Sequence, residues 1–108
     1  MPSFDDREKA FEAKYRQDQE FRFRVNSRRN KLLGEWAAGL MGLKGAAVES
    51  YAKDVVSSDF EKPGDGDVVE KVLKDLTAHG VKTDERTIRR EMERLLAVAA
   101  DQIGGKPA

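Results

Sequence analysis

Residues 5 to 33 read DDREKAFEAKYRQDQEFRFRVNSRRNKLL, a stretch that contains neither proline nor glycine. Ser3 precedes it as a suitable N-cap, and Asp5 and Asp6 suit the positive end of a helix dipole. Glycine and proline are the residues of lowest helix propensity, and the first of either after this start is Gly34. The sequence therefore predicts a long first helix over about residues 5 to 41.

The apolar face of this helix changes along its length. Phe4, Phe11 and Tyr15 fall within about 40° of one another at 100° per residue, and charged residues continue their line. A second apolar set is rotated from the first by roughly 60°. It comprises Phe21, Val25, Leu32, Trp36 and Leu40, with Leu33 beside them. Residues 16–20 between the two sets include no apolar residue. We therefore expect an arm over residues 1–18 and a core-forming segment that begins at residue 19.

Three shorter helices are predicted after the first. The second occupies residues 46–60, between Gly45 and the loop that starts at Pro63. The third begins at Asp67, which forms a near capping box with Glu70, and ends at Gly80. The fourth follows Thr83 as its predicted N-cap and extends to residue 103. Apolar residues at helical spacing give each of these last two helices a predicted core face: Val68, Val69, Val72, Leu73 and Leu76 in the third, and Ile88, Met92, Leu95, Leu96, Ala99 and Ile103 in the fourth.

Short connections favour antiparallel packing of successive helices. The predicted fold is therefore all-α, an up-and-down four-helix bundle whose long first helix starts as a flexible amphipathic arm. We expect the bundle to span residues 19–103 and residues 104–108, GGKPA, to form a disordered tail.

The composition argues against several classes of partner and location. The chain has 108 residues, and its 20 Lys plus Arg are balanced by 20 Asp plus Glu. The net charge therefore gives no electrostatic attraction to nucleic acid. It has no cysteine, no apolar stretch long enough to span a bilayer, and acids rather than an apolar segment near its start. We expect a cytoplasmic protein without nucleic-acid binding or direct membrane insertion.

Catalytic signatures are missing from the sequence. GxxxxGK[ST], GxGxxG and HExxH patterns do not occur, and His79 is the only histidine. We interpret His79 as a surface residue beside Gly80, with a pH sensor as the alternative. Neighbouring carboxylates such as Glu91 and Glu93 do not converge on a helix. We therefore expect that the protein is not an enzyme and that it has no catalytic residue, no metal site and no cofactor.

Five cations lie in a segment without acids: Arg22, Arg24, Arg28, Arg29 and Lys31. They have three interpretations: a solvated or internally paired face, a surface for an acidic protein partner, or a phosphate site. Phe23 lies opposite the second apolar set, so it either covers another helix, which we favour, or is an exposed anchor for a partner.

The arm is the clearest functional signal in the pattern itself. Its aromatic face is flanked by charges, as in amphipathic helices that dock in a partner's groove. The alternative is that the same face folds back on the bundle or that the segment frays. The pattern alone does not choose between them.

Two blocks of sequence carry a family resemblance. FDDRE from Phe4, followed by AFE and Lys14, and RRNKLLG from Arg28, followed by WAA, resemble the signatures of the zeta-type inhibitory subunit of alpha-proteobacterial F1-ATPase. Further matches extend through Tyr51, Phe60 and Leu95, so the resemblance spans nearly the whole chain. Ser27 departs from the alanine expected there.

The resemblance implies a regulatory protein that inhibits ATP hydrolysis. Its N-terminal segment would insert at a catalytic interface between the alpha and beta subunits and block rotation of gamma, placing the protein at the inner face of the plasma membrane. We expect a monomer when the protein is free. The partner-binding residues are then Phe4, Phe11 and Tyr15 as apolar anchors, with Asp5, Asp6, Arg7, Glu12 and Lys14 as polar contacts. The competing hypothesis is a nucleotide-binding or energy-sensing domain that uses the basic segment from Arg22 to Lys31 for a weakly bound nucleotide.

Overall fold

Four helices make up the part of the chain that the structure describes. The structure is a computed structural model that describes the backbone of residues 4–61 and 64–104 and the side chains of residues 18–60 and 64–104. The helices are α1 (Phe4–Leu40), α2 (Ala46–Glu61), α3 (Asp65–Ala78) and α4 (Glu85–Gly104), and these residues form no strand. The prediction of an all-α chain with four helices and a long first helix is confirmed.

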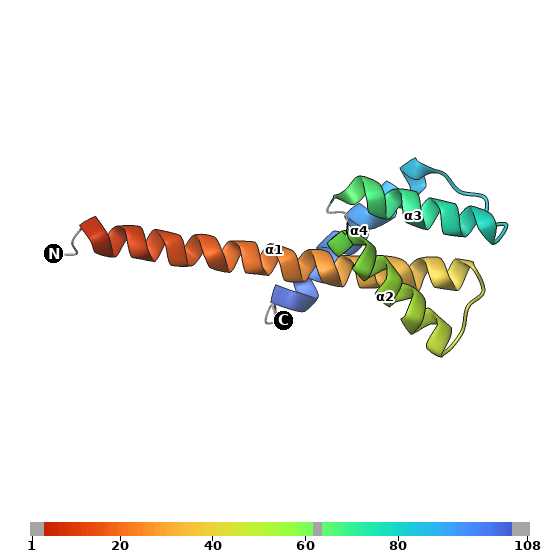
Figure 1. Ribbon diagram of the computed structural model, residues 1–108, viewed down its shortest axis with the longest axis horizontal. Helices are drawn as coiled ribbons and strands as arrows, with labels where there is room; N and C mark the ends of the chain where they lie inside the picture. The colour runs from red at the N-terminus through yellow and green to blue at the C-terminus, as the bar shows by residue number, and fades with distance from the viewer. Residues whose placement is uncertain (1–3, 62–63, 105–108) are drawn as a thin grey trace.

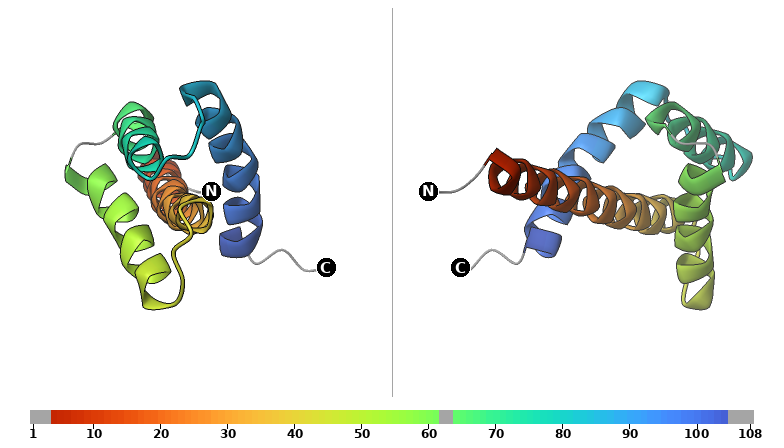
Figure 2. Two further views of the ribbon diagram at one scale, coloured as in Figure 1. Left: turned by 90° about the vertical axis from the view of Figure 1, so that its right-hand side faces the viewer. Right: turned by 60° about the vertical axis from the view of Figure 1, so that its left-hand side comes forward.

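The second half of α1 forms the centre of the bundle. Successive helices reverse direction, and the first half of α1 extends away from the other three helices (Figure 1). Viewed along its length, α1 lies between α2 and α4, with α3 beside it (Figure 2). The molecule measures 65 × 32 × 24 Å because of this projecting segment. The projecting part of α1, residues 4–18, is the described part of the predicted arm.

The hydrophobic core draws on all four helices. From the last three helices the core cluster takes these buried side chains: Val55, Val68, Val69, Val72, Leu76, Ile88, Met92 and Leu95. The apolar faces predicted for α3 and α4 are therefore confirmed, with Leu96 at the exposed edge of α4.

The predicted core face of α1 is partly wrong. Val25 and Leu33 are buried as expected, but Phe21 is 41% exposed and Leu40 is 47% exposed. Leu32 and Trp36 pack at the edge of the core. The buried face also contains Arg29, Asn30, Gly34, Ala37 and Ala38. It is rotated from the predicted stripe by roughly 100° at 100° per residue.

Small residues explain this rotation. A Cβ atom built on Gly34 would lie 2.6 Å from the Cα atom of Ala52, so the backbones of α1 and α2 approach each other closely at Gly34. Ala37, Ala38 and Ala52 are almost completely buried nearby in the same pair of helices. The backbones of α1 and α2 therefore pack closely where Gly34 meets Ala52.

The end of α3 has the predicted glycine signal. Gly80 has a φ of +77°. The amide of Val81 donates to the carbonyl of Leu76 at 3.0 Å, and the amide of Gly80 donates to the carbonyl of Thr77 at 3.0 Å. These two bonds make a Schellman motif. The predicted start of α3 is wrong: the helix begins at Asp65 and not at Asp67.

Asp84, not Thr83, caps α4. The amide of Thr87 donates to Oδ1 of Asp84 at 2.8 Å, and the amide of Ile88 donates to the carbonyl of Asp84 at 3.2 Å. The hydroxyl of Thr83 is buried without a hydrogen-bond partner. The predicted cap was therefore one residue too early.

Candidate functional site

The arm is a continuous extension of a bundle helix. No break separates it from the core segment, because α1 is helical throughout Phe4–Leu40. The eight predicted partner-binding residues belong to this extension, and their side chains lie outside the described residues: Phe4, Asp5, Asp6, Arg7, Phe11, Glu12, Lys14 and Tyr15. Their assignment stays a prediction.

The base of the arm is solvent-exposed. Asp18, Gln19 and Glu20 have exposed side chains, and the first buried side chain described along α1 is Val25. The buried core therefore begins about 10 Å beyond Asp18, at 1.5 Å per residue. The predicted boundary near residue 19 falls in this exposed stretch.

The structure separates the five cations of the basic segment. Arg22, Arg24 and Lys31 are exposed and Arg28 is partly exposed, whereas Arg29 is only 4% exposed. Four of the five are therefore available to a partner. Arg29 belongs to the interior.

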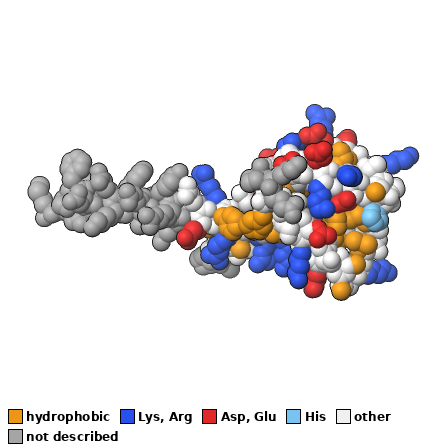
Figure 3. All heavy atoms as spheres, in the orientation of Figure 1, with side chains coloured by type: hydrophobic (Ala, Val, Ile, Leu, Met, Phe, Trp, Pro, Cys, Tyr) orange, Lys and Arg blue, Asp and Glu red, His pale blue; other side chains and the backbone are white. Residues whose placement is uncertain are grey.

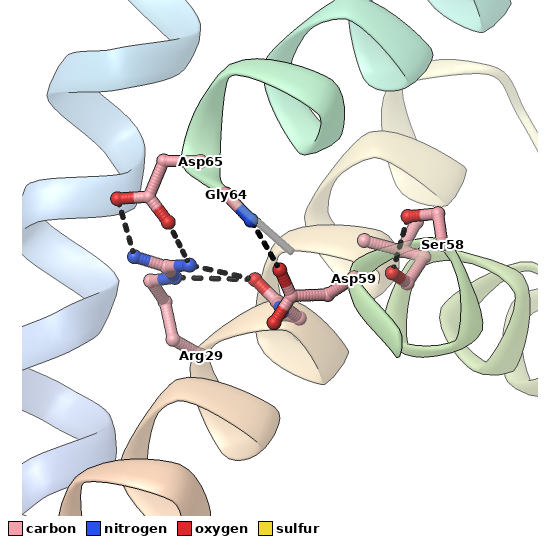
Figure 4. Close-up of polar contacts among 7 residues, drawn as sticks. Arg29, Ser58, Asp59, Gly64 and Asp65 are labelled. Atoms are coloured by element: carbon pink, nitrogen blue, oxygen red, sulfur yellow. Dashed lines mark hydrogen bonds and ion pairs between the residues drawn. The ribbon is translucent and has the colours of Figure 1, made fainter. Parts of the chain in front are cut away.

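Arg29 is held by an intramolecular network (Figure 4). Its Nη2 atom donates to Oδ1 of Asp65 at 2.8 Å, and its Nη1 atom approaches Oδ2 at 3.4 Å. Nε and Nη2 also donate to Oδ1 of Asn30, at 3.2 and 3.0 Å. An unpaired charge at such a buried position would cost several kcal/mol. The network therefore satisfies Arg29 and ties the first residue of α3 to the middle of α1.

The turn between α2 and α3 is tied down beside this network. The amide of Gly64 donates to Oδ1 of Asp59 at 3.4 Å (Figure 4). Sequence reasoning treated Asp65 as part of a loop and missed its pairing with Arg29. Its place immediately after Pro63 and Gly64, at a helix start, was the available signal.

A second polar cluster joins α2 to α3. The hydroxyl of Tyr51 donates to Oδ2 of Asp75 at 2.8 Å, and Lys71 Nζ lies 3.1 Å from the same oxygen and 5.5 Å from the centre of the Tyr51 ring. Burial, followed by the hydrogen bond to Asp75, raises the pKa of Tyr51 far above its ordinary value of 10.0. The phenol therefore stays protonated and serves as a hydrogen-bond donor between helices.

Two phenylalanines form an exposed pair at the base of the arm. Phe23 of α1 is 55% exposed and Phe60 of α2 is 59% exposed, and their ring centroids lie 5.4 Å apart. Phe23 thus contacts another helix, as favoured from the sequence, and also presents much of its ring to solvent. Hydrophobic side chains gather on the surface where the arm joins the bundle, with Lys and Arg nearby (Figure 3).

The hollows of the surface are lined by side chains of both charges. A groove of about 600 Å³ between α1 and α2 is lined by Lys31 and Lys53 but also by Glu35 and Glu49. Within residues 18–60 and 64–104, no group of acidic or histidine side chains could hold a metal ion. His79 is exposed, with Nδ1 2.9 Å from the carbonyl oxygen of Asp75. None of the described helices is long and apolar enough to cross a membrane.

Comparison with known proteins agrees with this geometry. A chain solved by solution NMR is 41% identical, covers 77% of this chain and 94% of its own length, and superimposes with a TM-score of 0.67. No curated protein sequence matches at a significant level. The family described as ATPase inhibitor subunit zeta matches residues 1–102, a range that includes both the arm and the bundle. This chain therefore belongs to the ATPase inhibitor subunit zeta family.

Proposed function

We propose that this protein inhibits ATP hydrolysis by F1-ATPase and that its arm is the inhibitory element. The observation that carries the proposal is the projecting helix: α1 continues past the bundle as an uninterrupted rod (Figure 1), and the family match includes this segment from residue 1. In this proposal the arm inserts at a catalytic interface of alpha and beta and blocks rotation of gamma.

The architecture supports a division of labour between arm and bundle. An isolated helix of the arm's length is only marginally stable in water, so partner contacts would supply much of its stability. The bundle is far wider than one helix, at 32 × 24 Å in its shorter dimensions, and would limit how deeply the arm enters. Phe4, Phe11 and Tyr15 would serve as the apolar anchors, and the neighbouring charges would fix the register.

This role makes the protein a regulatory subunit rather than an enzyme. Its proposed location is the cytoplasmic face of the plasma membrane, where it would be held by F1-ATPase and not by a membrane span of its own. The free protein is proposed to be a monomer that meets the alpha, beta and gamma subunits on binding.

The direct test is an ATPase assay with purified F1 from the same organism. The full chain should inhibit hydrolysis in a saturable way, and a chain that begins at Gln19 should not inhibit, although its circular dichroism and melting curve should still show a folded bundle. Inhibition by both proteins at equal concentrations would contradict the assignment of inhibition to the arm.

A point substitution sharpens this test. Phe11→Ala should raise the half-inhibitory concentration by about 10- to 100-fold, the range expected for an aromatic anchor worth roughly 2 kcal/mol or more. Lys9→Ala is the matched control, because Lys9 lies on the opposite side of the helix, about 160° away. Equal effects of the two substitutions would remove the aromatic face from the mechanism.

The nucleotide-sensing alternative has less support. Arg29, in the middle of the basic segment, is already paired with Asp65, and the groove next to Lys31 also presents Glu35 and Glu49, which would repel a phosphate. An NMR titration with ATP tests the alternative. Saturable shifts confined to Arg28, Lys31 and their neighbours would favour it, and small uniform shifts would remove it.

A further inference from the structure

The exposed pair Phe23 and Phe60 has more open aromatic surface than the fold requires. Both rings lie outside the core cluster, and each keeps more than half of its surface in solvent, at 55% and 59%. Their centroids lie 5.4 Å apart with the planes tilted by 51°, a common geometry for packed aromatic rings. The two helices thus hold a preformed apolar surface, which we call the aromatic platform.

Exposed aromatic rings that adjoin each other are typical of protein interfaces. Aromatic residues are enriched at interface centres because a rigid ring buries a large area with little loss of side-chain entropy. Phe23 and Phe60 come from different helices and already contact each other, so binding would need little reordering. The platform therefore has the properties of a docking surface.

We propose that the aromatic platform docks on the outer surface of F1, beside the mouth of the site that takes the arm. This inference rests on the proposed function and extends it to a second contact. Phe23 lies on the same uninterrupted helix as the arm, about 12 Å beyond Tyr15 at 1.5 Å per residue. A partner that encloses the arm therefore brings its own outer surface close to Phe23.

The charges around the platform specify the chemistry of the receiving surface. Arg22 and Arg24 flank Phe23 in the sequence and are exposed, and residues 21–34 contain no acid. Glu20 is an exposed acid one turn earlier, and Asp59, beside Phe60, accepts a hydrogen bond from the amide of Gly64. Cations thus predominate on the α1 side. The receiving surface is therefore an apolar spot with carboxylates at the rim that faces α1, whereas beside Phe60 the sequence has the acids Asp59 and Glu61.

The arm and the aromatic platform would bind together, because Phe23 of the platform lies on the same helix as the arm. Once the arm is inserted, the platform meets its receiving surface at high effective concentration, so its contribution would appear in the affinity without any change in the inhibited state.

The test measures inhibition of purified F1 by the full-length protein and its variants. The double substitution Phe23→Ser/Phe60→Ser should raise the half-inhibitory concentration at least 10-fold and leave maximal inhibition at saturation unchanged. Leu40→Ser is the matched control: Leu40 is 47% exposed on the same helix, about 26 Å from Phe23 at 1.5 Å per residue. It should change the half-inhibitory concentration less than twofold.

A charge variant keeps the test independent of folding. Arg24→Glu removes no packed side chain, because Arg24 is exposed, and it should weaken inhibition by about 3- to 10-fold at low salt and less at high salt. Melting curves of all variants identify any loss of folded protein. Wild-type inhibition values for both the double variant and Arg24→Glu would overturn the platform while leaving the inhibitory function intact.

Failure of the proposed function has a different signature. If the wild-type chain does not inhibit, its binding to immobilised F1 decides the question. Binding that the double substitution abolishes would support the platform without the inhibition. Binding that the double substitution leaves unchanged, or no binding of the wild-type chain, would overturn the platform.

Discussion

Gly34 lies where α1 crosses α2, and the backbone of Ala52 fills the space that a side chain would need. A Cβ atom at Gly34 would be 2.6 Å from the Cα atom of Ala52 and 3.3 Å from its Cβ atom. We predict that Gly34→Ala destabilises the protein by roughly 1–3 kcal/mol, since backbone must move to relieve the overlap. The change in the free energy of unfolding is measured as a shift in the midpoint of chemical denaturation.

Gly39 provides the matched control for Gly34. It lies in the same helix, and a Cβ atom there would meet nothing within 4 Å. Gly39→Ala should stabilise the protein by about 0.5–1 kcal/mol, because alanine loses less backbone entropy in a helix. A stabilising effect at both positions would mean that α1 and α2 are farther apart at Gly34 than described.

Arg29 shows the limit of residue-level prediction. The sequence presents five similar cations between Arg22 and Lys31, and only the folded chain distinguishes them. Arg29 points to the interior because α3 begins with Asp65 at that place, a contact between residues that are distant in the sequence. A solvated or internally paired face was one of the three sequence interpretations, and internal pairing describes Arg29.

At the scale of the element, the start of α4 depends on Asp84. Asp84→Ala should lower the thermal midpoint by a few degrees near neutral pH, since the amide of Thr87 loses its acceptor. That hydrogen bond, the largest cause, lowers the pKa of Asp84 below its ordinary value of 3.8. A carboxyl whose pKa falls on folding stabilises the fold above its unfolded pKa, and this contribution is lost as pH falls through the folded pKa. The difference between wild type and variant should therefore shrink below about pH 3.8.

Thr83→Val is the control for the cap. It keeps the shape of a side chain whose hydroxyl is buried without a partner, so the thermal midpoint should stay equal or rise. A fall with Thr83→Val and none with Asp84→Ala would restore Thr83 as the cap.

The elements themselves were largely predictable, but their buried faces were less so. Glycine and proline marked the loops, and the regular apolar spacing of α3 and α4 placed Val68, Val72, Ile88 and Met92 correctly in the core. In α1 the predicted core face is partly wrong because the largest apolar side chains do not mark the buried side of the helix. The close contact between α1 and α2 is instead made by Gly34 and Ala52, whose small size permits it and which carry little weight in a hydrophobic pattern.

At the scale of the whole molecule, residues 16–20, which include no apolar residue, predict a boundary between the arm and the bundle. The sequence did not decide whether the arm projects or folds back. That choice depends on whether the helix continues through the polar stretch, and α1 is uninterrupted there. The aromatic platform was also beyond sequence reasoning, because it needs the end of α2 to meet the base of the arm.

Solution scattering tests this shape. The radius of gyration is 17.4 Å, whereas a compact chain of this length would have about 13 Å. We predict a value near 17.4 Å for the full chain and one near 12 Å for a chain that begins at Gln19. A full chain near 13 Å would mean that the arm packs on its own bundle when free. Insertion would then first require its release, which would slow association with F1 relative to a chain whose arm already projects.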